Sequence, residues 1–299
     1  MLGERQSNYF YYDNWTGSIT MPTTKSFYIH AGYGKAASSW LQEKLFYPNP
    51  DINFFGKTTS HYPEWLMKIH YLDELYFEKE KYTIKNHISS LHDKSENKLS
   101  LISSEPFTNF GYLSCQAKRI KELFPNPKII LVIRNPIDLI ESFYKHNVKL
   151  GHFYLTIDNY LDWSDKYFAL HKRPPIFLPD LFYDNIIDYF TSMFGVNNFL
   201  WLKYENFRDN PTSFISRIEK FMHVDLGYVP EMSKEKIVKG ITYSEVASLR
   251  KRNFFQMIKK MGIESNESII FENEQVISFS LRRKLNNYFA QKCTMYEFN

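Results

Sequence analysis

The segment Lys128–Arg134, with the sequence KIILVIR, constrains the fold more than any other part of the chain. Its five central residues are all aliphatic, so a strand that they form must be buried on both faces. Such a strand is typical of the interior of a parallel sheet that helices cover on both sides. Asn135-Pro136 follows directly and predicts a helix that begins there and continues to about Leu150.

Strand-like and helix-like segments alternate along most of the chain. Further strands are predicted at Lys25–Gly32, Ile52–Phe55, Leu99–Ser103 and Asn198–Lys203, and further helices at Ser38–Phe46, Pro63–Lys81, Leu113–Phe124 and Pro211–Met222. This alternation predicts an α/β fold in which a single domain, residues 25–299, has a central parallel sheet flanked by helices. The core spans 25–225 and a helical, charged C-terminal extension spans 226–299, while residues 1–24 have no clear period and are expected to form an N-terminal arm.

The charge and cysteine content exclude several classes of protein. The 37 basic and 33 acidic residues give a net charge of +4, which suits a small anionic ligand but is too weak to indicate a nucleic-acid partner. Two widely separated cysteines exclude a disulfide scaffold and a cysteine-based zinc site. No apolar run approaches the ~20 residues of a membrane helix. With a polar N-terminus, this favours a cytoplasmic protein without membrane insertion.

The loop after the first predicted strand has the composition of an anion-binding loop. Its small residues let backbone N–H groups approach an anion, and the helix that follows directs its positive end there. Lys35 adds a full charge, and two hydroxyls add donors; the candidate residues are Gly34, Lys35, Ala36, Ala37, Ser38 and Ser39. The sequence therefore predicts a phosphate or sulfate site, with a tight turn carrying a solvated lysine as the alternative.

The loop differs from the nucleotide P-loop, G-x-x-x-x-G-K-[ST]. Lys35 stands three positions before Ser38 instead of next to a metal-binding hydroxyl. The strongest strand ends in Arg134, where a magnesium NTPase needs an acidic residue nearby. These differences favour anion binding without a metal and leave a P-loop kinase variant as a weaker alternative.

Three motifs together resemble the sulfotransferases that use PAPS (3′-phosphoadenosine 5′-phosphosulfate), and the bacterial members in particular. Lys35-Ala-Ala-Ser-Ser-Trp40 is similar to the family's K-[ST]-G-[ST]-[ST]-W, Arg134-Asn-Pro136 with Ser142 to its R-x-P and later serine, and Tyr204-Glu205 to its Y-E. The chain departs from the family at Ala36 and Ala37. The Ala37 methyl, where glycine is usual, is expected to narrow the loop or to require a negative φ.

This resemblance implies a P-loop-NTPase-like sulfotransferase fold and a nucleotide site with PAP, adenosine 3′,5′-bisphosphate, as the product. Lys35, Ser38, Ser39 and the amides of Gly34–Ser39 would hold the 5′-phosphosulfate, Trp40 would stack on adenine, Arg134 and Ser142 would bind the 3′-phosphate, and Tyr204 would contact the adenine edge. The planar donor fork of arginine suits phosphate independently of the resemblance. The structural alternatives are a core position for Trp40 and Tyr204, a surface ion pair for Arg134 and a helix contact for Ser142.

The resemblance also assigns catalytic roles. Lys35 would stabilise the leaving phosphate oxygen, and Glu105, just beyond the strand at Leu99–Ser103, would be the general base. His61, in a polar loop, is the rival base, although a lone loop histidine is more often exposed and idle. A helix cap or a salt bridge is the alternative role for Glu105.

The acceptor is less constrained than the donor. Aromatic residues are abundant, with 22 tyrosines and 26 phenylalanines, and suit the faces of sugar rings, but they suit a phenol equally well. The resemblance to bacterial members favours the hydroxyl or amine of a carbohydrate or other glycan. An inactive PAP-binding scaffold is a further alternative. The basic clusters Arg250–Arg252 and Arg282–Lys284 are solvated helix faces, segments that close over the nucleotide, or contacts for an acidic acceptor.

Overall fold

Five parallel strands form one sheet in the computed structural model, which describes residues 26–56, 62–93, 98–108, 112–161, 176, 178–234, 240–261 and 277–293. The strand order is β2 (Ile52–Gly56), β3 (Leu99–Ser103), β1 (Phe27–His30), β4 (Lys128–Ile133) and β5 (Phe199–Lys203). Ile29 of β1 pairs with Ile102 of β3 on one side and with Ile129 of β4 on the other. All of β1 and all of Ile129–Ile133 are buried, which confirms the predicted parallel sheet.

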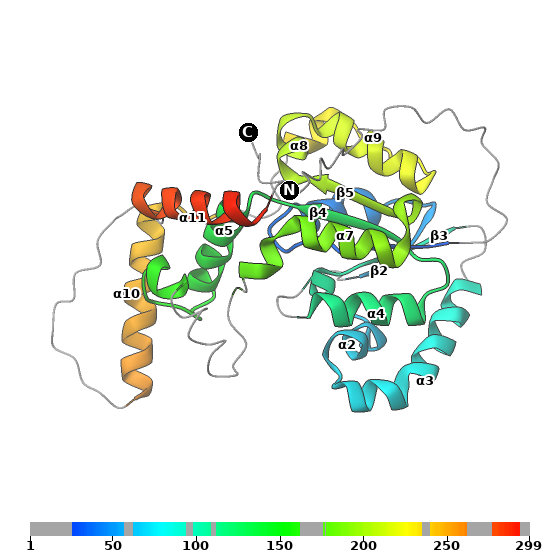
Figure 1. Cartoon of the computed structure of the whole chain (residues 1–299), viewed down its shortest axis with the longest axis horizontal. Helices are drawn as coiled ribbons and strands as arrows, with labels where there is room; N and C mark the ends of the chain where they lie inside the picture. Colours follow the sequence, from blue (N-terminus) through cyan, green and yellow to red (C-terminus); the bar gives the residue numbers. More distant parts are fainter. Residues whose placement is uncertain are drawn as a thin grey trace, which may run out of the picture.

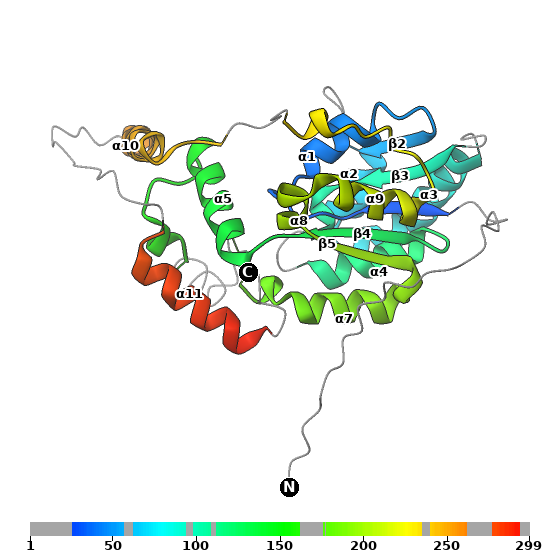
Figure 2. The ribbon, with the colours of Figure 1, turned by 90° about the horizontal axis from the view of Figure 1, so that it is seen from above.

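Helices cover both faces of this sheet (Figures 1 and 2). The helices α4 (Leu113–Leu123) and α7 (Tyr183–Phe194) lie on one face, and α1 (Ser38–Leu41), α8 (Tyr204–Asp209) and α9 (Pro211–Met222) lie on the other. The helix α9 buries Phe214, Ile215, Ile218 and Met222, a spacing that places one apolar stripe against the sheet. Two further helices, α2 (Glu64–Tyr71) and α3 (Glu74–Asp93), pack on α4.

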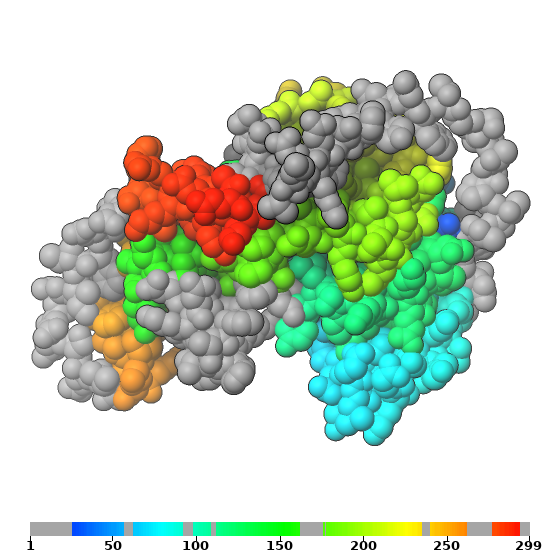
Figure 3. All heavy atoms as spheres, in the orientation of Figure 1, coloured from blue at the N-terminus to red at the C-terminus, as the bar shows by residue number. Residues whose placement is uncertain are grey.

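Three helices lie together beyond the carboxyl end of β4. They are α5 (Pro136–Lys149), α10 (Tyr243–Lys260) and α11 (Phe279–Lys292), and Figure 3 shows α11, in red, on the surface there. The buried amide of Asn253 joins α10 to the end of α5, because its Nδ2 donates to the Val148 carbonyl at 2.7 Å and to the Phe153 carbonyl at 2.9 Å. The described part of the C-terminal extension is therefore helical, as predicted.

The predicted helix at Pro63–Lys81 is wrong as a single element. Leu72 has an extended backbone with ψ 135°, so α2 ends at Tyr71 and α3 begins at Glu74. The carboxylate of Asp73 accepts from the Leu75 N–H at 3.0 Å and so caps α3. Arg119 of α4 donates to the carbonyls of Ile69 at 2.7 Å and of Leu72 at 2.8 Å, which satisfies the end of α2. The predicted helix at Ser38–Phe46 does form, but its second half, Gln42–Phe46, has π-helical bonding.

Candidate active site

The loop between β1 and α1 folds into a cradle of backbone N–H groups. It leaves the sheet still paired with β4, since the Ala31 N–H donates to the Ile130 carbonyl at 2.9 Å. Lys35 and Ala37 then adopt left-handed conformations with φ 69° and φ 66°, and Ala36 between them does not. Such an alternation is typical of loops whose N–H groups bind an anion. The Ala36 N–H itself donates to the Tyr33 carbonyl at 3.2 Å, so the other N–H groups of the loop are the candidate anion donors. The expectation of a negative φ at Ala37 is therefore wrong, and alanine occupies a conformation that favours glycine.

Two glycines in this loop allow close approach of other groups. A Cβ at Gly32 would lie 2.7 Å from His30 Nε2 and 2.8 Å from Ser38 Oγ, so no larger residue fits there. A Cβ at Gly34 would lie 3.5 Å from the Glu105 carboxylate and 3.2 Å from the Phe143 ring. Glu105 and Phe143 thus both approach Gly34, in the loop that carries Lys35.

Arg134 is joined to the loop and to Tyr204. Its Nη1 donates to the Lys35 carbonyl at 2.8 Å, and its guanidinium lies 4.8 Å from the centre of the Tyr204 ring. Its buried Nε has no partner among the described residues. Glu205 binds the Asn135 N–H at 2.9 Å through one oxygen, and its other oxygen is buried and unpaired within the described structure. These contacts bring the three predicted motifs together in the structure.

Trp40 is 7% exposed and packs against two other aromatic rings. The ring of Phe207 lies 4.8 Å from it and the ring of Tyr228 lies 6.3 Å from it. The indole N–H of Trp40 and the hydroxyl of Tyr228 are both buried without a partner among the described residues. Tyr228 was not predicted as a site residue, because it follows α9 in a segment with no motif.

The predicted serines occupy three different environments. Ser38 is buried and its Oγ donates to the Tyr33 carbonyl at 3.1 Å, which fixes the start of α1. Ser39 is half-buried beside it on α1. Ser142 is half-buried on α5 and precedes Phe143, whose ring approaches Gly34.

Glu105 lies at the start of the 3₁₀ turn η2 (Glu105–Thr108), directly after β3. The Thr108 hydroxyl lies 3.2 Å from the Gly32 carbonyl and 3.0 Å from the Glu105 carbonyl, so it ties this turn to the anion loop. The carboxylate is half-buried. The rival base, His61, and the predicted arm at residues 1–24 lie outside the described residues.

Two buried histidines lie under the site. Burial lowers the pKa of His30 and of His70 to about 4, so both imidazoles are neutral at pH 7. His30 Nδ1 lies 2.7 Å from Ser103 Oγ, and its Nε2 has no partner among the described residues.

The basic clusters of the C-terminal helices pair with other parts of the chain. Arg282 Nη1 lies 3.1 Å from the Asp138 carboxylate and its Nη2 lies 3.3 Å from the Glu141 carboxylate, both on α5. Arg250 Nε donates to the Tyr154 carbonyl at 3.1 Å. Arg282 thus neutralises acidic groups within one turn of Ser142 on α5.

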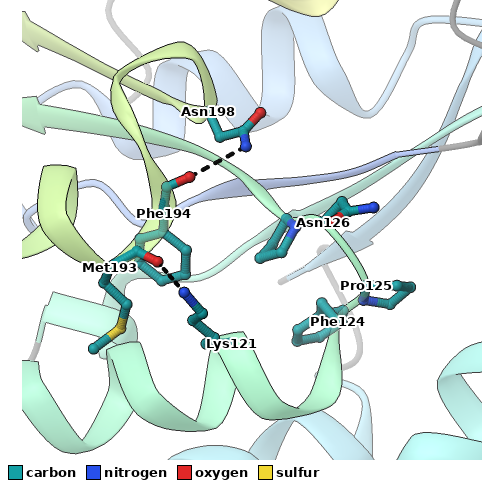
Figure 4. Close-up of a pocket in the computed structure, with 8 residues that line it drawn as sticks. Lys121, Phe124, Pro125, Asn126, Met193, Phe194 and Asn198 are labelled. Atoms are coloured by element: carbon teal, nitrogen blue, oxygen red, sulfur yellow. Dashed lines mark hydrogen bonds between the residues drawn. The ribbon is translucent and has the colours of Figure 1, made fainter.

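A separate pocket of about 200 Å³ lies at the opposite end of the sheet (Figure 4). Asn126 precedes β4 and Asn198 precedes β5, so this pocket is at the amino ends of the strands. Lys121 closes one side by donating to the Met193 carbonyl. None of the predicted site residues lines it.

Two kinds of feature are absent from the described ranges of the chain. There, no three His, Cys, Asp or Glu side chains are grouped as metal ligands. No helix in the same residues combines the length and the apolar character that a membrane crossing requires.

Comparisons with known proteins identify the family. The chain resembles the crystal structure of a sulfotransferase from Alicyclobacillus acidocaldarius, at 18% identity and a TM-score of 0.53, over 81% of this chain and 98% of that one. A more distant likeness is to a mouse sulfotransferase complexed with PAP, at 13% identity and a TM-score of 0.44, over 90% of this chain and 85% of that one. Another is to the sulfotransferase domain of the Synechococcus PCC 7002 olefin synthase, at 15% identity and a TM-score of 0.40, over 87% of this chain and 97% of that one. No curated protein matches significantly in sequence.

The family model described as the sulfotransferase domain matches residues 28–295, nearly the whole of the described chain. The fold agrees with this match, since the Alicyclobacillus enzyme shares it over most of its length. The chain belongs to the sulfotransferase family that its motifs resemble, and it is a sulfotransferase.

Proposed function

We propose that the protein transfers the sulfuryl group of PAPS to a hydroxyl or an amine of a carbohydrate acceptor. The observation that carries this proposal is the convergence of Lys35, Arg134 and Glu105 around one anion-binding loop. Arg134 directly follows β4, Glu105 follows Ser104 after β3, and Lys35 lies in the loop between β1 and α1. All three are therefore beyond the carboxyl ends of strands, where ligands bind in open parallel sheets.

The residues at the site fit the two charged groups of PAPS and its adenine ring. The N–H groups of Gly34–Ser39 and the Lys35 ammonium would hold the 5′-phosphosulfate. Arg134, whose Nε is a buried donor without a partner in the described structure, would bind the 3′-phosphate together with Ser142. The adenine would lie beside three aromatic side chains: Trp40, Tyr204 and Tyr228. The indole N–H of Trp40 and the hydroxyl of Tyr228 have no hydrogen-bond partner within the described structure.

The chain's own residues would perform three tasks. PAPS supplies the sulfuryl group and, in its phosphate, the leaving group. Lys35 stabilises the negative charge that grows on the leaving oxygen, because its ammonium is carried by the same loop. Glu105 takes the proton from the acceptor as the new O–S or N–S bond forms, and its place over Gly34 puts the carboxylate next to that loop. Phe143 shields the same place from water.

His61 is the second candidate for the general base.

The walls of the acceptor site would include the aromatic residues of α2 and its surroundings, among them Tyr71, which is 55% exposed. Aromatic faces with polar neighbours suit a sugar ring and a phenol equally well. The resemblance of the motifs to those of bacterial sulfotransferases is what supports a carbohydrate acceptor.

A thermal-shift titration with PAP, alongside 5′-AMP and ATP with magnesium, tests the donor site. Stabilisation grows as RT ln(1 + [L]/Kd), so millimolar PAP with a micromolar Kd would contribute ~4 kcal/mol. A shift with PAP that 5′-AMP does not match would support the 3′-phosphate site. A shift only with ATP and magnesium would favour the kinase variant, and PAP binding without any sulfuryl transfer would favour the inactive scaffold.

A further inference from the structure

A chain of four hydrogen-bonding side chains adjoins Glu105, and the mechanism above does not use it. The members come from four parts of the sequence: Tyr62 before α2, His70 on α2, Ser104 after β3 and Gln116 on α4. His70 Nε2 lies 2.8 Å from Ser104 Oγ, and His70 Nδ1 lies 3.0 Å from Gln116 Oε1. The Tyr62 hydroxyl bonds the Ser104 hydroxyl. Ser104 immediately precedes Glu105, so this chain ends beside the base.

The direction of the Tyr62 proton follows from one fixed acceptor. The Gln116 Nε2 donates to the His70 carbonyl at 3.1 Å, which turns the Gln116 Oε1 toward His70 Nδ1. Nδ1 therefore carries the imidazole proton and donates it, and Nε2 is an acceptor. Two hydroxyls lie within reach of the Nε2 lone pair: Ser104 Oγ at 2.8 Å and the Tyr62 oxygen at 3.5 Å. If Ser104 donates to His70, the Ser104 oxygen accepts from Tyr62; if Tyr62 donates to His70, the Tyr62 oxygen accepts from Ser104. In both orders the Tyr62 proton points inward.

On the side that faces away from these hydrogen-bonded groups, the Tyr62 oxygen consequently presents only lone pairs. The side chain is half-buried, and burial raises the pKa of the Tyr62 hydroxyl. The hydrogen bond with Ser104 opposes this increase, and the nearby Tyr71 and Glu105 add to it. Tyr62 thus stays protonated at neutral pH and is a hydrogen-bond acceptor toward a ligand, not a base. Burial keeps His70 neutral, with a pKa of about 4, so the proton order persists above that pH.

We infer that Tyr62 is a specificity-determining residue that accepts a hydrogen bond from the sulfuryl acceptor next to the group that Glu105 deprotonates. This inference rests on the proposed function, because it takes Glu105 as the base. A hydroxyl has one proton, and Glu105 receives it. The donor to Tyr62 must then be a second N–H of an amine or the neighbouring hydroxyl of a diol. Tyr62 therefore favours amines and the vicinal diols of sugars over a simple phenol, which has a single donor.

The test compares three probe acceptors with wild-type protein and Tyr62→Phe. The probes are 4-nitrophenol, 4-nitrophenyl β-D-glucopyranoside and D-glucosamine, each with ³⁵S-labelled PAPS, and PAP binding is measured by calorimetry in both proteins. For Tyr62→Phe we expect kcat/KM to fall ~10–100-fold with the glucoside and glucosamine, because the second donor loses its partner, and to change less than ~3-fold with the phenol. PAP affinity stays unchanged.

Equal losses with all three probes, or a wild-type preference for 4-nitrophenol, would overturn the role of Tyr62. Binding of PAP without sulfation of the glucoside or glucosamine would also overturn it, while leaving the donor site intact. Absence of PAP binding would instead refute the proposed function itself.

The proton order has a readout that needs no turnover. The ¹⁵N spectrum of histidine-labelled protein distinguishes the two neutral imidazole tautomers, and the His70→Gln variant assigns the His70 signals. We expect His70 with a protonated Nδ1 and a bare Nε2 at pH 7. A protonated Nε2 would reverse the order of protons through Ser104 and refute the argument for Tyr62.

Discussion

Replacing Ala37 by glycine should stabilise the protein, against the usual effect of a glycine substitution. Ala37 has φ 66° and ψ 8° at the N-cap of α1, where a Cβ crowds the following carbonyl. A left-handed conformation costs an L-residue roughly 1–2 kcal/mol, while the extra backbone entropy of glycine costs about 0.5–1 kcal/mol. The difference is a gain of about 0.5–1 kcal/mol in the free energy of unfolding.

Urea unfolding followed by circular dichroism measures this difference, and Ala36→Gly is the matched control. Ala36 is the neighbouring alanine in the same loop, but it is fully buried and its φ is not positive. Its replacement loses a buried methyl group and adds backbone entropy, so it should destabilise the protein by about 1–2 kcal/mol. If Ala37→Gly lowers the free energy of unfolding as Ala36→Gly does, the left-handed alanine carries no strain and the reasoning is refuted.

Three further predictions concern catalysis, packing and pH. Lys35→Ala should lower turnover ~10²-fold or more and Glu105→Gln should abolish most turnover while calorimetry still detects PAP; undiminished turnover in either variant would remove that residue from the mechanism. Asn253→Ala should lower the free energy of unfolding by about 1–3 kcal/mol in urea titrations, because two buried hydrogen bonds are lost, although the Val148 carbonyl keeps the Gly151 N–H as a donor. An unchanged midpoint would mean that α10 does not hold the end of α5. The unfolded chain binds histidine protons near pH 6.5, whereas His30 and His70 bind them near pH 4, so stability should fall as the pH drops through this window, by about 3 kcal/mol per histidine. A His30→Gln variant with the same pH slope as the wild-type protein would contradict this assignment.

The sheet was predictable because its signals are local. Each strand of the core is a short apolar run, and the burial of all five residues of Ile129–Ile133 follows directly from their composition. The break between α2 and α3 was not predictable in this way. The apolar spacing continues through Leu72, and the interruption depends on Arg119, which lies 47 positions further along the chain and donates to the Leu72 carbonyl.

The donor side of the site could also be anticipated from the sequence. Arg134 and Tyr204 directly follow β4 and β5, and Lys35 lies in the loop after β1. Parallel strands bring such residues to one edge of the sheet. Their contacts in the structure agree with this placement. The conformation of Ala37 was predicted wrongly, because hydrogen bonds of the surrounding loop outweigh the cost of a left-handed alanine. Two of them are from the Ala36 N–H to the Tyr33 carbonyl and from the Leu41 N–H to the Ala37 carbonyl.

The acceptor side could not be anticipated, and the reason is physical. Tyr62, His70, Ser104 and Gln116 are common residue types on four separate elements, and no spacing among them is regular. Tyr62 acts as a hydrogen-bond acceptor because of the direction in which its proton points. The His70 carbonyl orients the Gln116 amide, and this orientation fixes the proton position on the imidazole and so turns the Tyr62 proton inward. Each step has two possible orientations, and only a fixed backbone acceptor at one end selects between them. The sequence shows which groups are present, but the orientation of their protons is fixed only after the elements have packed. The acceptor preference that we infer for Tyr62 therefore depends on tertiary structure, whereas the motifs for the sulfuryl donor can be recognised in the sequence.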